Sequence, residues 1–426
     1  MSMKNVLVFP CGSEVGLEVN RSLAHSIHFT LFGGSSVDDH GKFVYKNYIS
    51  DIPFIDAPNF IDELTKIVEL YDIDFIIPTH DSAVIKMAEN QSIINATVIT
   101  SCEETCKIAR SKRKTHEVFD KIIPTPKVYD ITEKMDFPVF LKPDVGQGTK
   151  GCYKVNTQEE VDFYFKKDPT LLAIEYLPGK EYTVDCFTDN KGKLLFAEGR
   201  ERRRIMNGIS VNSKQINNPK FQELAEIINQ TLSFQGVWFY QVKERTNGEL
   251  VIMEIAPRIA GTMALFRAEG VNFIQLSLFD RMGIETCILK NNLDLEIDRA
   301  LFSRYSIKEN YDYVYIDFDD TIIVNNTVNT DMIKFLYQSK NRGKIIILIT
   351  KHKNDIRQTL LKFSISDLLF DKIIVLEQND LKSNHIKNIN SIFIDDSFAE
   401  RKNVMETLKI PCFGIDAVES LLYWKV

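Results

Sequence analysis

The chain has 426 residues, a formal net charge of −7 and a hydrophobic content of 44%. Because a single core rarely grows beyond about 250–300 residues, we expect two to four domains. The acidic balance argues against a general nucleic-acid-binding protein. No apolar stretch reaches the roughly 18–20 residues of a membrane helix. The seven cysteines show no paired spacing, so we expect a reduced, cytoplasmic protein.

The first hundred residues alternate apolar strands with helical patterns, which predicts a parallel sheet. Strands are expected at "NVLVFP", "FTLFGG" and "DFIIPTHD". The turn after the first strand contains Gly12 and Gly16 but lacks the full dinucleotide fingerprint, which argues against a nicotinamide cofactor. His80 and Asp81 end the third strand, where they either line a cleft or form an ordinary turn.

The pattern changes at about residue 107. A basic helix is followed by the hairpin signals "CFTDNKGKLLFAEG" and "ERTNGELVIMEI", which predict antiparallel α+β structure. Residues 291–310 read as a polar connector. Strand–helix alternation then returns with "YVYIDF", "KIIILIT", "DKIIVL", "SIFIDD" and "IPCFGI", which predicts a small doubly wound domain.

The segment "FPVFLKPDVGQGTKGCYKV" carries a phosphate-binding pattern. Lys142 lies on a predicted strand, and three glycines punctuate the loop that follows. Glycines let backbone N–H groups approach phosphate oxygens, although a glycine-rich turn by itself is more often a hairpin. Two later segments favour phosphate binding: "AIEYLPGKEYTVDCF" places Glu175 and Glu181 around a turn, and "VIMEIAPRIAGT" places Glu254 and Arg258 at a strand end.

These motifs, in this order and at these separations, resemble the ATP-grasp superfamily, whose members include biotin carboxylase, carbamoyl-phosphate synthetase and D-alanine–D-alanine ligase. The resemblance covers residues 1–295 and implies a Rossmann-like pre-ATP-grasp domain (1–106) and an ATP-grasp domain (107–295). It implies ATP and Mg²⁺ as cofactors. Lys112 in "SKRKT" matches a phosphate-contacting lysine, with Lys114 as its rival. The implied nucleotide-binding set is Lys112, Lys142, Gly146, Gly148, Thr149, Gly151, Glu175, Leu177 and Glu181.

The resemblance also implies a magnesium site. Glu254 matches the main ligand, and Gln241, one strand earlier, matches the second metal position. One carboxylate and one amide oxygen suffice for Mg²⁺, which keeps several waters and binds the phosphates. The superfamily usually has asparagine where this chain has Ala256, so a two-metal arrangement is in doubt while ATP binding is not.

The segment "EGRERRRIMNG" is unusually basic. Strand alternation places Arg200, Arg202 and Arg204 on one face, where they form either a solvated basic strand or an anion pocket. The resemblance favours the pocket, because the superfamily places basic residues over its active site and arginine forks match phosphate and carboxylate groups. We therefore expect Arg202 and Arg204 to contact the nucleotide and Arg258 to be catalytic, with Arg267 as a further candidate.

A second chemical pattern begins at "VYIDFDDTII", where two aspartates follow an apolar strand. Residues 310–426 resemble the haloacid dehalogenase (HAD) superfamily of phosphatases, with its four motifs in order. The resemblance implies Asp317 as nucleophile, Asp319 as acid/base, Thr350 as phosphoryl ligand and Lys382 as the screening lysine, with Lys387 as runner-up. The implied magnesium-binding residues are Asp317, Asp319, Asp395 and Asp396. The short segments between the motifs leave no room for a cap domain.

Together these patterns predict an α/β and α+β multidomain enzyme with a Rossmann-like domain, an ATP-grasp fold and a capless HAD Rossmannoid domain. The predicted function is ligation of a small-molecule carboxylate to an amine through an acyl phosphate, coupled to a phosphomonoesterase acting on a phosphorylated compound of the same pathway. We expect no nucleic-acid or membrane partner, and the resemblance allows a homodimer. Two alternatives stay open: an ATP-grasp kinase that releases a phosphorylated product, and a nucleotide-responsive regulator with an inactive ligase half.

Overall fold

The computed structural model describes residues 2–146, 148, 150–307 and 310–425. The chain forms two compact units, residues 1–301 and 302–425. The first unit therefore includes both the predicted Rossmann-like domain and the predicted ATP-grasp domain. Among the described residues, no helix is both long and apolar enough to span a membrane.

The first unit begins with a five-stranded parallel sheet, as the alternating pattern predicts. Its strand order is β3 (Asn47–Ile49), β2 (Phe29–Gly34), β1 (Lys4–Phe9), β4 (Phe75–Pro78) and β5 (Thr97–Val98). The associated helices are α1 (Glu14–Leu23), α2 (Phe60–Leu70), α3 (Asp81–Glu89), α4 (Glu103–Arg110) and the short η1 (His40–Phe43). Helices α1 and α3 start directly after β1 and β4, so their first turns lie at the carboxyl edge of the sheet.

A four-stranded antiparallel sheet follows the helix α5 (Lys112–Phe119). Its order is β6 (Val128–Tyr129), β9 (Leu171–Glu175), β7 (Val139–Pro143) and β8 (Tyr153–Val155), and α6 (Gln158–Lys167) packs on it. Strand β7 ends in the predicted phosphate lysine and leads into the glycine-rich loop, because the chain must turn there to form β8.

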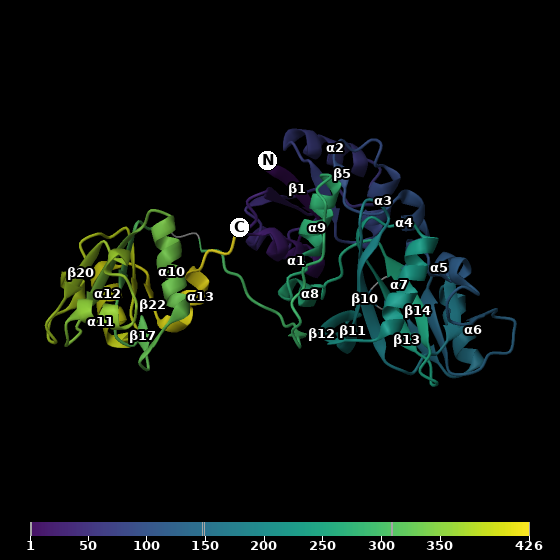
Figure 1. The fold of residues 1–426 in the computed structure, drawn as a ribbon. Helices are drawn as coiled ribbons and strands as arrows, with labels where there is room; N and C mark the ends of the chain where they lie inside the picture. The colour runs from purple at the N-terminus through teal and green to yellow at the C-terminus, as the bar shows by residue number, and fades with distance from the viewer. Residues whose placement is uncertain (1, 147, 149, 308–309, 426) are drawn as a thin grey trace. The chain divides into compact units, whose positions relative to one another are not determined.

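The remaining sheet of the first unit has six antiparallel strands. Its order is β14 (Leu250–Ala256), β13 (Gly236–Glu244), β10 (Glu181–Thr188), β11 (Leu194–Met206), β12 (Ile209–Ile216) and β15 (Glu296–Asp298). Both predicted hairpins are present, as β10–β11 and β13–β14. Helix α7 (Pro219–Thr231) lies along one face of this sheet (Figure 1), where Phe221, Ala225 and Ile228 pack into its core.

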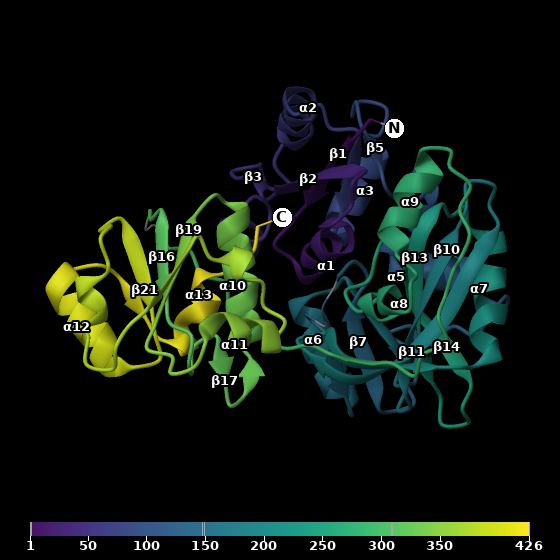
Figure 2. The same ribbon diagram turned by 60° about the vertical axis from the view of Figure 1, so that its left-hand side comes forward.

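The other face of this sheet is covered by α8 (Ala264–Ala268) and α9 (Phe273–Arg281), and Figure 2 shows α9 lying beside β13. These helices share a hydrophobic core with the first turns of the parallel sheet, through residues such as Val15, Phe239 and Phe266. The two sheets are thereby fixed against each other, and the carboxyl edge of β1 and β4 faces the six-stranded sheet.

In the described part of the predicted connector, residues 291–307 and 310, one strand is present. Residues 296–298 form β15, which pairs with β12 at the edge of the six-stranded sheet. Polar and apolar contacts both hold it: the amide of Asn212 donates to Glu296 and Asp298, at 2.9 Å each, and Ile297 packs against the hydrophobic core. A composition-based reading of this segment could not detect such a strand.

The second unit is a five-stranded parallel sheet, and all five predicted strands are present. Its order is β20 (Lys372–Val375), β19 (Ile345–Thr350), β16 (Tyr313–Ile316), β21 (Ser391–Ile394) and β22 (Cys412–Phe413). The other elements are the β17–β18 hairpin (Ile323–Val324 and Thr327–Val328), α10 (Thr330–Asn341), α11 (Ile356–Lys362), α12 (Phe398–Leu408), α13 (Val418–Leu421), η2 (Asp367–Leu369), η3 (Lys382–Asn384) and η4 (Ile415–Ala417).

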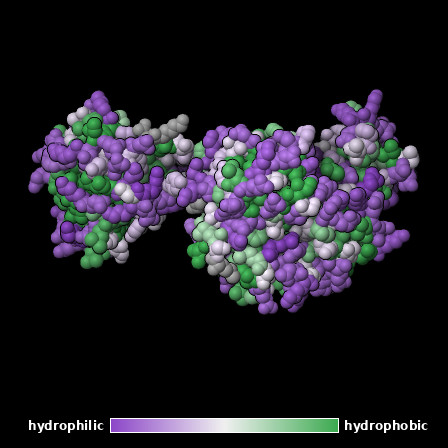
Figure 3. Space-filling view, turned by 90° about the horizontal axis from the view of Figure 1, so that it is seen from above, coloured by the Kyte–Doolittle hydropathy of each residue, from purple (hydrophilic) through white to green (hydrophobic). Residues whose placement is uncertain are grey.

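Apolar cores lie on both faces of this sheet, because its strands are buried between helices. The space-filling view in Figure 3 shows that hydrophilic residues cover most of the visible surface, with hydrophobic residues in scattered groups. Buried polar side chains lie at the carboxyl ends of β16, β19 and β21, namely Asp317, Thr350 and Asp395.

Candidate active sites

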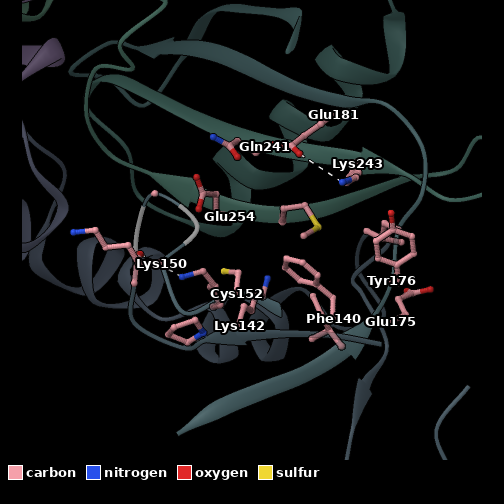
Figure 4. A pocket seen from close by; sticks show the side chains of 17 residues that line it. Phe140, Lys142, Lys150, Cys152, Glu175, Tyr176, Glu181, Gln241, Lys243 and Glu254 are labelled. Atoms are coloured by element: carbon pink, nitrogen blue, oxygen red, sulfur yellow. Dashed lines mark hydrogen bonds and ion pairs between the residues drawn. The ribbon is translucent and has the colours of Figure 1, made fainter. Parts of the chain in front are cut away.

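A cavity of about 160 Å³ lies between the four-stranded and six-stranded sheets. In Figure 4, Gln241 and Glu254 reach in from one wall, and Lys142 and Cys152 from the other. Nine predicted residues line this cavity: Lys112, Lys142, Gly146, Gly148, Glu175, Leu177, Glu181, Gln241 and Glu254. Gly151 does not line it but has the positive φ of +72° that favours glycine. Thr149 lies outside the described residues.

Four lysines line this cavity, and two of them, Lys112 and Lys142, influence each other electrostatically. Lys142 is buried, and its pKa is lowered to about 8 by that burial and by the nearby charge of Lys112. Lys112, not its rival Lys114, lines the cavity, and its Nζ donates to the carbonyls of Asp144 and Gly146 at 3.2 and 3.4 Å. Among the described residues, neither Lys112 nor Lys142 has a carboxylate within 4.0 Å, whereas Lys243 lies 3.7 Å from Glu181. Two cations without a counter-ion fit an anionic ligand.

Ion pairs hold the segment from Glu175 to Glu181, which forms one wall of the cavity. Arg245 binds the carboxylate of Glu175, which also accepts from the backbone N–H of Lys127 at 2.9 Å. The Glu175 side chain is therefore committed to the protein, and the backbone near Leu177 remains to contact a ligand. Glu181 pairs with Arg202 at 3.0 Å and lies 3.7 Å from Lys243, so its carboxylate is fixed toward the cavity.

Gln241 and Glu254 are direct neighbours across the β13–β14 pair. A register shift follows Gln241 in this pair and helps to present both side chains to the same space. Among the described residues, the Glu254 carboxylate has neither a hydrogen bond nor an ion pair. Its oxygens remain available beside an amide oxygen, which is a donor set that suits Mg²⁺. Ala256 is buried in the core at the end of β14, and its methyl group offers no ligand.

A second cavity of about 540 Å³ adjoins the first and shares Gln241 and Glu254 with it. Its other walls include the first turns of α1 and α3, so His80 and Asp81 line the cavity as the cleft interpretation requires. Arg258 also lines it and is held by Asp81 through an Nε–Oδ1 contact of 2.5 Å. Despite burial, the pKa of Asp81 is lowered, because the charge of Arg258 outweighs the cost of desolvation.

The basic strand β11 differs from its predicted arrangement beyond Arg202. Arg200 is buried against Asp185, with a contact of 2.7 Å, and Arg202 is fixed by Glu181. Register shifts between Arg202 and Ile205 interrupt the alternation of the strand. The guanidinium of Arg204 is consequently half-exposed and pairs with Asp298 at 2.8 Å, lining neither cavity. Its predicted contact with the nucleotide is not supported. Arg267 pairs with Glu18 instead of entering the cavities.

Several cavity residues were missed from the sequence. Arg110 reaches the glycine-rich loop by donating to the carbonyl of Gly146 at 3.2 Å. Glu14 and Arg299, 285 positions apart in the chain, meet at 3.4 Å in the larger cavity. Their separation explains the omission, since no local pattern connects them. The basic composition around Arg110 was the only available signal.

The second unit gathers its predicted residues at the carboxyl ends of β16, β19 and β21. Among the described residues, the carboxylates of Asp317, Asp395 and Asp396 form one group that could hold a metal, with ligand atoms within 4.8 Å of one another. The Nζ of Lys382 lies 2.7 Å from Asp317 and 2.6 Å from Asp395. Lys387, the runner-up, contacts the carbonyl of Asn384 and lies outside the cavity.

Burial sets the electrostatics of this cluster. It raises the pKa of Asp317, and the neighbouring Asp395 carboxylate adds to the effect while Lys382 opposes it. Burial alone would lower the pKa of Lys382, but the two carboxylates reverse the direction and raise it. The lysine is thus held as a cation between two acids, which is the environment that a phosphoryl group requires.

Asp319 and Thr350 face the same cavity, whose volume is about 530 Å³. The Asp319 side chain is 52% exposed, and both its oxygens lie within 3.0 Å of His352 Nδ1. His352 was missed from the sequence, although it follows Thr350 by two positions. In the described part of the second unit, only the short β17–β18 hairpin separates Ile322 from α10, so no cap domain occurs there.

Comparisons with known proteins agree with the architecture of the first unit. Solved structures with a similar fold include the biotin carboxylase domain of 2-oxoglutarate carboxylase from Hydrogenobacter thermophilus, a dimer in complex with MgADP, ADP and bicarbonate. It has a TM-score of 0.57 and 15% identity, over 70% of this chain and 73% of that chain. N5-carboxyaminoimidazole synthetase from Staphylococcus aureus has a TM-score of 0.54 and 15% identity, over 67% and 78%. The first unit therefore has a mixed α/β, ATP-grasp-like fold.

Sequence comparisons point the same way. Residues 167–297 match a family model described as ATP-grasp in the biosynthetic pathway with Ter operon. The large chain of carbamoyl phosphate synthase from Clostridium beijerinckii is 23% identical over 308 residues, which cover 63% of this chain and 29% of that protein. D-alanine–D-alanine ligase from Petrotoga mobilis is 25% identical over 158 residues, covering 32% and 53%. The chain thus spans under a third of the carbamoyl phosphate synthase it matches, and an ATP-grasp superfamily assignment is supported for the first unit.

Proposed function

We propose that the first unit is an ATP- and Mg²⁺-dependent carboxylate–amine ligase. The observation that carries this proposal is the convergence of Lys112, Lys142, Gln241 and Glu254 on one cavity, next to a larger cavity that can hold the reacting acid and amine. Glu254 and Gln241 would hold the magnesium ion, which neutralises phosphate charge when bound.

The protein's own groups support acyl-phosphate chemistry. Lys142 and Lys112 bind the transferring phosphates, and the buried walls exclude water from the acyl phosphate. The substrate carboxylate attacks the γ-phosphorus, and ADP leaves. The amine then attacks the acyl carbon, a C–N bond forms, and inorganic phosphate leaves. Arg258, fixed by Asp81 in the wall of the larger cavity, is placed to bind the acid or its phosphate.

ADP release across a panel of acids and amines tests the ligase, with the products identified by mass spectrometry. A condensed product with loss of water confirms it, whereas an acid that only gains phosphate indicates the kinase alternative. Nucleotide binding without turnover indicates a regulator.

The Glu254→Gln variant should lower kcat by at least about 100-fold, because it removes the one carboxylate of the metal site. Glu249→Gln, on the same hairpin but outside the cavity, is the matched control.

We further propose that the second unit is a capless, Mg²⁺-dependent phosphomonoesterase of the HAD type. Its support is the cluster of three carboxylates with Lys382 between two of them. Asp317 attacks phosphorus and displaces the ester oxygen, which takes a proton from Asp319. Water, deprotonated by Asp319, then releases phosphate from Asp317. Asp317, Asp395 and Asp396 would hold a magnesium ion, which would neutralise charge on the phosphoryl group.

The phosphatase proposal predicts that Asp317→Asn abolishes release of phosphate from phosphomonoesters while the ADP-forming activity of the first unit continues. In a reaction containing both activities, the phosphorylated compound should then accumulate. Undiminished phosphate release by Asp317→Asn would contradict the proposal. A loss of both activities would show that the two sites are not independent.

A further inference from the structure

The half-exposed carboxyl group of Asp319 has one side-chain partner among the described residues. His352 Nδ1 lies 3.0 and 2.9 Å from its two oxygens. The imidazole itself is 9% exposed, and it packs edge-on against Phe318 with ring centroids 5.3 Å apart. Its backbone N–H donates to Thr350 Oγ1 at 3.2 Å. One residue therefore connects the phosphoryl-binding hydroxyl with the acid/base carboxyl.

The opposite edge of the imidazole is also fixed. His352 Nε2 lies 2.9 Å from the hydroxyl of Thr359, on the first turn of α11. That hydroxyl donates its single proton to the carbonyl of Asp355 at 2.9 Å, so its oxygen is left to accept from Nε2–H.

We propose that His352 is a positioning residue of the phosphatase site, which holds the Asp319 carboxyl group in place through Nδ1 while Thr359 and Thr350 fix the histidine itself. The inference rests on the phosphatase function proposed above. Held in this way, Asp319 is placed to donate a proton to the ester oxygen as the bond between that oxygen and phosphorus breaks, while Asp317 forms the new bond to phosphorus. His352 also lines the cavity, but both its ring nitrogens are bound within the protein, so we assign its effect to Asp319.

This role differs from a purely structural one in its dependence on the leaving group. A poor leaving group such as an alkoxide needs the proton as it departs, whereas p-nitrophenolate departs without it. A loss of proton donation therefore slows alkyl phosphates selectively. Damage to the nucleophile, to the metal site or to the fold slows both kinds of ester.

The test uses the full chain with magnesium and compares β-glycerophosphate with p-nitrophenyl phosphate. His352→Phe keeps the ring against Phe318 but removes both nitrogens. We expect kcat for the alkyl ester to fall about 10- to 100-fold, with kcat for the nitrophenyl ester changed by less than about threefold. Thr359→Val, which removes only the partner of Nε2, should produce a smaller effect of the same kind. His385→Phe is the control, since His385 pairs with Asp380 and does not line the cavity.

Equal losses on both esters would overturn the inference, as would unchanged rates on both in His352→Phe. If His352→Phe fails to fold, the Thr359→Val comparison decides in the same way. If the unaltered protein hydrolyses neither ester, nor any other phosphomonoester in a wider panel, the phosphatase proposal itself fails. That outcome is distinct from a wild-type activity that His352→Phe reduces without regard to the leaving group.

Discussion

At the scale of single residues, the closeness of Lys112 and Lys142 predicts how many protons the protein takes up when a nucleotide binds. The pKa of Lys142 is lowered to about 8 by burial and by Lys112. A bound polyphosphate favours the charged form, so binding should raise this pKa. Between about pH 8 and 9, we therefore expect MgADP binding to take up as much as about one proton per site. Titration calorimetry in buffers of different ionisation enthalpy measures this uptake.

Lys142→Met should abolish the proton uptake and weaken nucleotide binding by more than about tenfold, because a charge-assisted contact is lost. Lys114→Met is the matched control and should change neither quantity. In the free protein, the lowered pKa means that the unfolded chain binds more protons than the folded one above about pH 8. The Lys142 contribution to stability consequently rises with pH from there toward the ordinary lysine value of 10.5.

Only some of the candidate site residues could be predicted from the sequence. Lys142, Glu254 and Asp317 could be located because each ends an apolar strand, and the carboxylates and lysine have an obvious chemical use there. Arg204 lines neither cavity of the first unit, because register shifts interrupt the alternation of β11, and such shifts leave no mark in a strand pattern. His352 was missed because its role depends on contacts with two segments distant from each other in sequence.

At the scale of elements, the β11–β12 hairpin contacts the glycine-rich loop. Gly208, with φ +78°, lies so close that an added Cβ would approach the backbone carbon of Gly148 to 2.4 Å. Because backbone atoms cannot give way as a flexible side chain can, Gly208→Ala should displace the loop. We expect the KM for ATP to rise by at least about tenfold, which corresponds to about 1.4 kcal/mol. Steady-state kinetics of ADP formation provides the measurement.

The chain offers a matched control for this change at the tip of the β10–β11 hairpin. Gly192 has a φ of +79°, and an added Cβ there would meet nothing within 4 Å. Gly192→Ala carries the same backbone strain, of about 1–2 kcal/mol, without the contact. If both variants raised the KM equally, backbone strain rather than loop displacement would explain the effect, and the prediction would be wrong.

At the scale of the whole molecule, the alternation of strands and helices was enough to predict both parallel sheets and the antiparallel middle. This alternation could not predict which segments distant in the sequence pair with each other. Strand β15 joins β12 across more than eighty positions through Asn212, and Glu14 meets Arg299 in the same way. A shared hydrophobic core makes residues 1–301 one compact unit, and the boundary expected near residue 106 stays a prediction.

The two units have separate apolar cores, which predicts separate responses to ligands. In calorimetry of the full chain, MgADP at 100 times its Kd should stabilise the first unit by about 2.7 kcal/mol, because it binds only the folded form. Magnesium with orthovanadate, a mimic of the transferring phosphoryl group, should stabilise the second unit instead. Lys142→Met should remove the first shift and Asp317→Asn the second, each leaving the other in place. A single transition shifted by both ligands would contradict the independence of the units, because either ligand would then stabilise one cooperative fold.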